Sequence, residues 1–298
     1  MNDPDDLDVF LEGYSPDAKL EHALLLPYRY DPIPKNRILE DSSCVASLER
    51  TALSDGIKVL DQHEHGIRSV QFLDENHAKW SEHFRDYVLG RGVPTNKLDA
   101  FIMAFAKIWV DGRKDRHFSP EMLSIKASIR DLDRLRNPKA AGRFVIDQLD
   151  EDVAPLLTPD EMAAIFDANA GLIEALLPDY IDALGDRGPG SLGGLYVRRG
   201  VFMEHTDSFR RELHYLSSYS LALGPVEQFA QTGASRNKGM ASIFSAPIGA
   251  IQNRVVAFAP FIAGMNLSQL ELVVAPPTRK MPLTNHGLHA GILEFSFE

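Results

Sequence analysis

The chain has 298 residues, of which 44% are hydrophobic and 24% charged, a composition typical of a globular protein with one large or two modest domains. Its net charge of −11 disfavours a surface built for nucleic-acid backbones or anionic membranes. A single cysteine, Cys44, excludes an internal disulfide, and no uninterrupted apolar run is long enough to span a bilayer. The acidic start, Met1 to Asp8, lacks the basic and apolar regions of a cleavable signal peptide. We therefore expect a cytoplasmic protein, or one secreted into a target cell without such a peptide.

Residues 15–190 are predicted to be mostly helical, because apolar residues recur there at helical spacing. Ser119 before Pro120 and Thr158 before Pro159 indicate helix starts, since a hydroxyl N-cap followed by proline suits the first turn. The expected helices are Val45–Leu60 (interrupted at 54–56), Ile67–Val88, Leu98–Val110, Pro120–Leu135, a helix from Thr158 that ends at Leu177-Pro178, and Asp179–Leu184.

After residue 190 the pattern changes to short β-prone runs separated by glycine and proline turns. This texture favours a compact twisted sheet over a parallel array of β-α-β units. Strands are expected at Leu195–Val201, Ser242–Phe244, Arg254–Phe261, Glu271–Ala275 and Gly291–Phe297. The predicted fold class is α+β, with a helical N-terminal region followed by a β-rich part.

Three segments of the β-rich part carry polar side chains in apolar surroundings. The first strand contains Arg198 and Arg199, and a planar guanidinium suits a carboxylate or a phosphate. A second strand delivers the hydroxyl cluster Ser217–Ser220 to a strand–helix junction. In the third segment, Gln269 and Glu271 are two residues apart, so both side chains leave the same face of a strand.

In this order, the three segments resemble the motifs of the arginine–serine–glutamate class of mono-ADP-ribosyltransferases, and in particular the Rho-modifying exoenzymes and their bacterial effector relatives. Val197-Arg198-Arg199-Gly200 is similar to the arginine motif, with Arg199 as the expected equivalent and Arg198 as the alternative. Ser218-Tyr219-Ser220-Leu221 with Phe229-Ala230 is similar to the serine motif, although Tyr219 stands where the family has threonine. Gln269-Leu270-Glu271, followed by Leu272-Val-Val-Ala-Pro-Pro-Thr278, is similar to the glutamate motif. The resemblance covers roughly the last 110 residues.

The resemblance implies a fold and a domain organisation. Residues 153–298 would form an ADP-ribosyltransferase-like catalytic domain, a twisted mixed β-sandwich with flanking helices. Residues 1–152 would form a helical accessory or targeting domain. That domain could recognise the target or bind a chaperone, an inhibitor or an activator.

The resemblance also implies NAD as co-substrate and a role for each motif residue. The nicotinamide ribose becomes oxocarbenium-like as nicotinamide leaves, and Glu271 would stabilise this charge. Arg199, or Arg198, would hold the NAD pyrophosphate next to Gly200. The serines would position these groups: Ser218 would hold Glu271 and the nicotinamide ribose, and Ser220 would support the strand.

The acceptor would be chosen by Gln269 and Phe261. In the family, glutamate at the place of Gln269 goes with arginine acceptors, and glutamine goes with asparagine, glutamine or nucleobase acceptors. Phe261 belongs to the segment that corresponds to the acceptor-recognition loop, and its alternative role is that of a core strand residue. A protein side chain is the expected acceptor, because the acidic charge balance disfavours nucleic acid.

Other readings remain open. The leading one is a mono-ADP-ribosyltransferase that acts as a bacterial or phage toxin or effector. Its rivals are an NAD glycohydrolase with water as acceptor, a non-catalytic interaction module, and a helical metal or haem protein built on the N-terminal histidines. Each motif residue also has a plain structural alternative: a solvated Glu271, an Arg199 paired with Glu204, a turn hydroxyl at Ser218. No metal is expected, because the histidine pairs lack a third placed ligand. Those pairs are His63/His65, His205/His214 and His286/His289.

Overall fold

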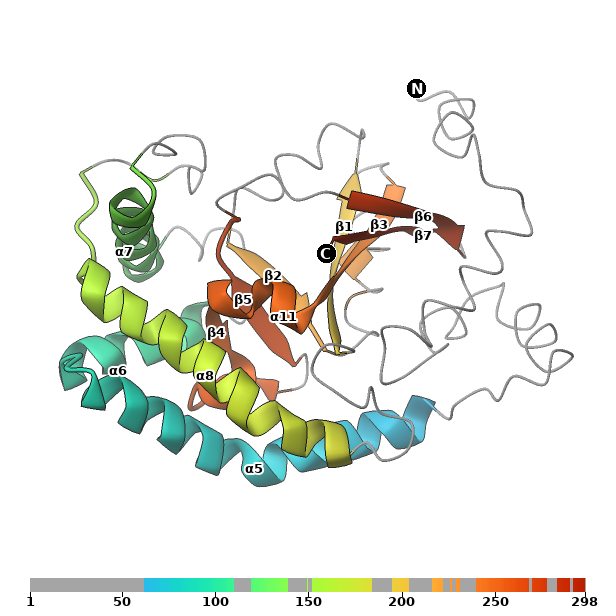
Figure 1. The fold of residues 1–298 in the computed structure, drawn as a ribbon, viewed down its shortest axis with the longest axis horizontal. Coiled ribbons are helices and arrows are strands. Elements are labelled where there is room, and N and C mark those ends of the chain that lie inside the picture. Colours follow the sequence, from blue (N-terminus) through green and yellow to red (C-terminus); the bar gives the residue numbers. More distant parts are fainter. Residues whose placement is uncertain are drawn as a thin grey trace, which may run out of the picture.

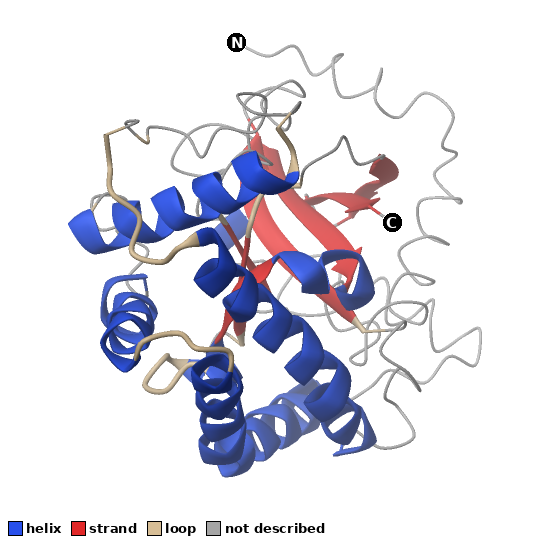
Figure 2. Ribbon diagram, turned by 60° about the vertical axis from the view of Figure 1, so that its left-hand side comes forward, coloured by secondary structure: helices blue, strands red, loops and turns tan. Residues whose placement is uncertain are grey.

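The computed structural model describes residues 62–109, 119–138, 149, 152–183, 195–203, 216–221, 226, 229–230, 240–267, 270–277, 283–289 and 292–297. Helices gather on one side and a mixed β-sheet lies behind them (Figures 1 and 2). Within the described part of the chain, no helix has the length and apolar character needed to cross a membrane.

The helical layer consists of α5 (Gln62–Gly90), α6 (Thr95–Met103), η1 (Ala104–Ile108), α7 (Pro120–Arg136) and α8 (Pro159–Ala183). The segment η1 is a π-helix that continues α6 directly. α5 and α8 pack against each other and run side by side in Figure 1. The helices expected to start near Ile67, Leu98, Pro120 and Thr158 are confirmed, whereas the one expected at Val45–Leu60 lies outside the described residues.

α8 continues through Pro178, where the sequence predicted a break and a new helix. Proline removes a backbone donor and usually costs a helix interior about 3 kcal/mol. Here Leu177, Tyr180 and Ile181 on either side are buried in the core. The prediction of a break was wrong because tertiary packing holds the two turns together across the proline.

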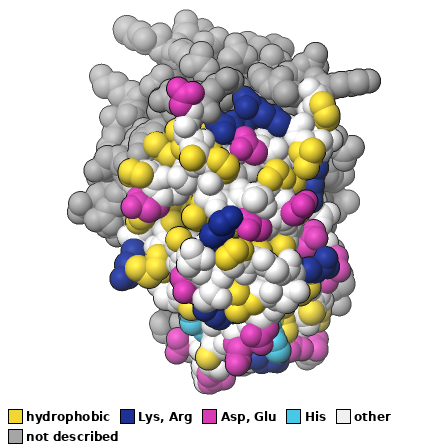
Figure 3. All heavy atoms as spheres, turned by 90° about the vertical axis from the view of Figure 1, so that its left-hand side faces the viewer, with side chains coloured by type: hydrophobic (Ala, Val, Ile, Leu, Met, Phe, Trp, Pro, Cys, Tyr) yellow, Lys and Arg dark blue, Asp and Glu magenta, His cyan; other side chains and the backbone are white. Residues whose placement is uncertain are grey.

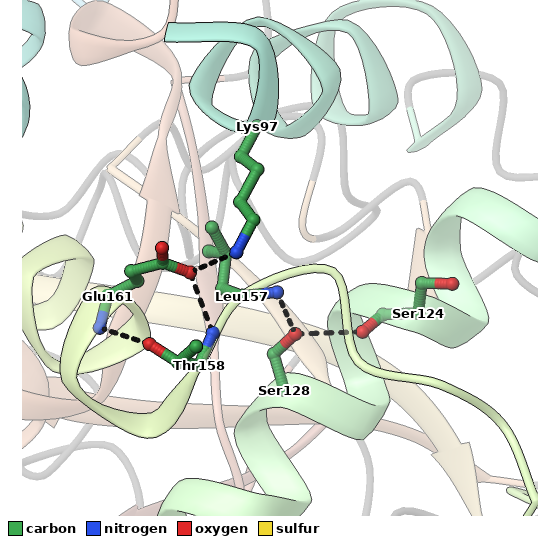
Figure 4. Close-up of polar contacts among 6 residues, drawn as sticks. All are labelled: Lys97, Ser124, Ser128, Leu157, Thr158 and Glu161. Carbon is green, nitrogen blue, oxygen red and sulfur yellow. Dashed lines mark hydrogen bonds and ion pairs between the residues drawn. The ribbon is translucent and has the colours of Figure 1, made fainter. Parts of the chain in front are cut away.

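α8 begins at a capping box, in agreement with the predicted helix start. The N–H of Glu161 donates to Thr158 Oγ1 at 3.3 Å, and the N–H of Thr158 donates to the Glu161 carboxylate at 2.8 Å. Lys97 of α6 donates to the same carboxylate oxygen at 2.7 Å (Figure 4). Burial would raise the pKa of Glu161, but the hydrogen bonds from Lys97 and Thr158 outweigh burial and lower that pKa. The cap therefore also ties α6 to the start of α8.

The approach to α8 is held from α7 by a buried serine. The Ser128 hydroxyl donates to the carbonyl of Ser124 at 2.9 Å and accepts from the N–H of Leu157 at 2.9 Å (Figure 4). The N–H of Leu156 donates to the same Ser124 carbonyl at 3.1 Å. These bonds satisfy backbone groups that are removed from water, and they fix the position of α8 against α7.

The strands are β1 (Tyr196–Met203), β2 (Ser217–Ser220), β3 (Met240–Pro247), β4 (Val255–Phe258), β5 (Glu271–Val274), β6 (Leu283–His289) and β7 (Ile292–Phe297). They pair into one seven-stranded sheet in the order β4-β5-β2-β1-β3-β7-β6. All neighbours are antiparallel except β3 and β7. The α+β class with a mixed sheet is confirmed.

Two details of the sheet differ from the sequence prediction. β6 was not predicted, and the strand expected over Arg254–Phe261 ends at Phe258. It continues as a 3₁₀ turn, η8 (Ala259–Phe261), with Pro260 in its first turn. Upstream, α11 (Ile248–Ile251) and η7 (Gln252–Arg254) link β3 to β4.

One apolar core extends from the helices into the sheet. The rings of Trp80 in α5 and Phe261 meet edge-on, with their centroids 5.9 Å apart. The ring of Phe258 in β4 also meets that of Phe261 edge-on, with a centroid distance of 4.9 Å. Asn169 of α8 donates to the carbonyl of Val256 in β4 at 2.9 Å. The core therefore crosses the expected domain boundary between residues 152 and 153, and that boundary stays a prediction.

Candidate active site

A row of polar residues crosses the middle of the sheet. Ser220 of β2 stands opposite Glu271 of β5 on one side and opposite Arg198 of β1 on the other. Arg198 in turn stands opposite Ser245 of β3, and Ser245 stands opposite Ser296 of β7. Directly opposed residues on neighbouring strands point to the same face of a sheet. These five buried side chains therefore share one face, and the three motif segments occupy adjacent strands in the order β1, β2, β5.

Ser218 joins this row at Glu271. It lies two residues before Ser220, so its side chain leaves the same face of β2. Its hydroxyl donates a hydrogen bond to Oε1 of Glu271, 53 residues further along the chain. Ser218 is exposed, whereas only 9% of Glu271 is exposed. The serine therefore lies between the carboxylate and solvent.

Two opposing effects act on the pKa of the Glu271 carboxyl. Burial raises its pKa, and the hydrogen bonds from Ser218 and Trp109 act in the opposite direction. A carboxylate that is removed from water but held by fixed donors acts strongly on nearby charge, because the local dielectric is low. This is the property needed to stabilise a developing positive charge.

A strained turn places Glu271 at the start of β5. Leu270 has a φ of 44°, the only positive value among non-glycine residues in the described ranges. This region costs an L-residue roughly 1–2 kcal/mol. The side chain of Leu270 is buried, its N–H donates to Leu267, and its carbonyl accepts from the N–H of Leu221. These contacts hold the turn that aims Glu271 at Ser218.

Trp109 is a residue of the site that sequence reasoning missed. Its indole N–H donates to Oε1 of Glu271 at 2.7 Å, although it lies 162 residues earlier, in the region expected to be accessory. The signal at sequence level was the spacing of Phe101, Phe105 and Trp109, and this spacing predicts a core face of a helix, with no indication of a polar contact.

Arg198 and Arg199 point to opposite faces of β1, because side chains alternate along a strand. Arg198 shares the face of Ser220 and Glu271 and is 2% exposed. Arg199 stands opposite Phe244, a member of the large core, and is partly exposed. The register therefore favours Arg198, the alternative, as the arginine on the face of Glu271.

Gly200 allows a close approach between β1 and the segment after β2. A Cβ at Gly200 would lie 1.9 Å from the carbonyl oxygen of Val226 and 3.0 Å from the backbone nitrogen of Ala230. These two residues belong to a second apolar cluster on this part of the sheet, made of Val226, Ala230, Ala241, Ile243 and Ile292. Packing alone accounts for the glycine, with no ligand needed.

The two residues expected to choose the acceptor differ in what the structure says of them. Gln269 lies outside the described residues. Phe261 is fully buried between Trp80 and Phe258, so in this conformation its ring has no surface for an acceptor. The geometry favours its alternative role as a core residue.

A cavity of about 340 Å³ lies away from Glu271, where the end of α7 meets α8, η7 and the residues that follow β5. Its polar lining includes Arg130, Asp133, Arg136 and Arg254, and none of the predicted site residues takes part. The described residues contain no group of three or more histidine, cysteine, aspartate or glutamate side chains that could hold a metal ion.

The surface on the helical side carries both signs of charge. In the view of Figure 3, acidic and basic side chains are interspersed over the described residues. Some form direct pairs, such as Arg85 with Asp99 at 2.7 Å. Interspersed charges of this kind are typical of a solvated surface and give no strong field of one sign.

Comparison with protein-family models, with curated proteins and with solved structures finds no match to this chain.

Proposed function

We propose that the chain is a mono-ADP-ribosyltransferase, which cleaves NAD and transfers ADP-ribose to a macromolecular acceptor as a toxin or effector. The observation that supports this proposal most directly is the hydrogen bond from Ser218 to Glu271. It joins two of the three motifs on adjacent strands, and Arg198 of the third motif lies in the same row on the next strand. Motifs that matched by chance would have no reason to meet on one face of a sheet.

In the proposed reaction, the bond between C1′ of the ribose and the nicotinamide nitrogen breaks, and its electron pair leaves with nicotinamide. A new bond forms between C1′ and the acceptor nucleophile, whose proton passes to solvent. The ribose carries positive charge between these events, as sugars do in glycoside hydrolysis. Glu271, buried and held by two donors, supplies the fixed negative charge that stabilises this state.

In this proposal, Arg198 binds the pyrophosphate of NAD. Its guanidinium lies on the same face as Glu271, across β2, and guanidinium groups bind phosphate oxygens through charge-assisted hydrogen bonds. Arg199 extends from the opposite face and provides a matched control, since it is the same residue type one position away.

Two alternatives use the same described residues. An NAD glycohydrolase would differ only in taking water as the acceptor, so that ADP-ribose is released. A non-catalytic interaction module would bind without turnover. A buried carboxylate costs stability, and this favours a catalytic role over a module that would gain nothing from it.

The proposal is tested with the full chain, NAD labelled in its adenosine part, and lysates of bacterial and eukaryotic cells before and after nuclease treatment. Labelled macromolecules that disappear with Glu271→Gln support transfer, and loss of label with nuclease identifies a nucleic-acid acceptor. Free labelled ADP-ribose without labelled macromolecules supports the glycohydrolase. Absence of NAD cleavage under all these conditions refutes both enzymes.

The arginine assignment is tested in the same assay. Arg198→Met should lower NAD cleavage at least about 10-fold, because one charge-assisted contact is lost, and Arg199→Met should retain most of it. The reverse pattern would return the role to Arg199.

A further inference from the structure

The helical layer supplies a residue to the candidate site. Trp109, 3% exposed, donates its indole N–H to Oε1 of Glu271 at 2.7 Å, and Ser218 donates to the same oxygen. We propose that Trp109 is a positioning residue for Glu271: its N–H favours the ionised form of the carboxylate, and by holding Oε1 it turns the second oxygen, Oε2, toward the substrate. The inference rests on the proposed function and makes the helices before residue 110 part of the active site.

The backbone of η1 brings Trp109 to this position. An α-helix turns by about 100° per residue, so residues 101, 105 and 109 would drift around a regular helix by about 40° at each step. The π-helical segment Ala104–Ile108 has wider turns, and the N–H of Trp109 bonds to the carbonyl of Ala104, five residues back. The wider turn offsets part of the drift. Such segments are rare and frequently occur at functional sites.

A ladder of rings fixes the direction of the indole. The ring centroid of Phe105 lies 4.9 Å from that of Phe101 and 5.9 Å from that of Trp109, and all three side chains are buried. Packing of this kind removes alternative rotamers before any ligand arrives. The N–H therefore already points at Glu271, and little ordering is needed when the substrate binds.

The chemistry of the two donors differs. A serine hydroxyl can donate to a carboxylate or accept from a protonated carboxyl, so it tolerates both forms of Glu271. An indole N–H can only donate, so it favours the carboxylate. Both donors reach Oε1, and none of the described residues donates to Oε2. Oε2 is therefore the oxygen that we assign to the ribose hydroxyl.

The first test needs no substrate turnover. The chain has two tryptophans, so the folded full-length protein should give two indole N–H signals in a proton–nitrogen NMR spectrum, and Trp109→Phe identifies which belongs to Trp109. We expect the Trp109 signal to shift with pH as Glu271 titrates, and to lose this dependence in Glu271→Gln. A signal that does not respond to pH in the wild type, or responds equally in Glu271→Gln, overturns the inference.

The second test measures NAD cleavage against pH. Trp109→Phe should lower kcat about 10-fold with little change in KM, because a hydrogen bond to a charged group is lost. The acid limb of the profile should move to higher pH, because removing a donor to the carboxylate leaves burial less opposed and the pKa of Glu271 rises further. An unchanged acid limb with wild-type kcat overturns the inference.

Trp80→Phe is the matched control. Trp80 is also fully buried, but it packs against Phe72 and Phe261 in the core. Trp80→Phe should lose packing contacts in the core without shifting the acid limb of the pH profile for NAD cleavage. If Trp109→Phe does not fold, Trp80→Phe assigns the two indole signals instead, and the NMR comparison of wild type with Glu271→Gln still decides. A wild type that does not cleave NAD would refute the proposed function, while the NMR result would still report whether Trp109 senses Glu271.

Discussion

Gly200→Ala should destabilise the fold strongly, although it adds only one methyl group. That methyl would lie 1.9 Å from the carbonyl oxygen of Val226 and 2.9 Å from its carbonyl carbon. Ordinary contacts of this kind exceed about 3.4 Å, so the segment at 226 must move by more than about 1 Å. Both atoms belong to backbone, and no side chain can rotate away. Overpacking costs typically about 1–3 kcal/mol, and we expect about 3 kcal/mol here.

Urea unfolding followed by circular dichroism measures this change. With a slope of about 3 kcal/mol per molar urea, a loss of about 3 kcal/mol lowers the midpoint by about 1 M. Gly171→Ala is the control: Gly171 is exposed in α8, and nothing lies within 4 Å of its added Cβ. It should raise stability by about 0.5–1 kcal/mol, because alanine favours helix. A Gly200→Ala protein within about 0.5 kcal/mol of wild type would refute the close approach of the two segments.

Further predictions concern stability and its dependence on pH. Glu271→Gln should be more stable than wild type at neutral pH. Burial raises the folded-state pKa of Glu271, so the wild type loses stability as pH rises through that pKa. In urea titrations, the difference in unfolding free energy between the two proteins should shrink toward acid pH. Glu161→Gln should show the opposite sign, because the lowered pKa of Glu161 gives stability that is present at neutral pH and lost as pH falls through the folded pKa. Ser128→Ala should lower the free energy of unfolding by about 1–3 kcal/mol, since it leaves the N–H of Leu157 without its acceptor. A variant that unfolds at the same urea concentration as wild type would contradict this. Phe261→Ala should cost about 3–5 kcal/mol by thermal or urea unfolding if the ring is a core residue, and much less if it faces an acceptor.

Periodicity and capping were sufficient to predict most of the helical layer. Ser119 and Thr158 act as the caps that their positions indicated, because cap chemistry is local. The break at Pro178 could not be judged in this way. Whether a helix survives a proline depends on what its neighbours bury, and the contacts of Leu177, Tyr180 and Ile181 are tertiary.

The candidate site was predictable in part. The motif order indicated which residues to inspect, but not which face each side chain would take. The choice between Arg198 and Arg199 depends on strand register, since a shift of one residue exchanges the faces. Trp109 could not be found, because its role depends on a π-helical segment and on a partner 162 residues away.

The same separation of 162 residues has a consequence for folding. Helical turns form from neighbouring residues, whereas the contact of Trp109 with Glu271 closes a very long loop and requires β5 to be paired with β2. The contact that holds the Glu271 carboxylate is therefore expected to form late, after the helical signal has recovered during refolding. A partly folded chain would contain much of its helix content and none of its activity. The proposed consumption of NAD would in this way begin only when the fold is complete.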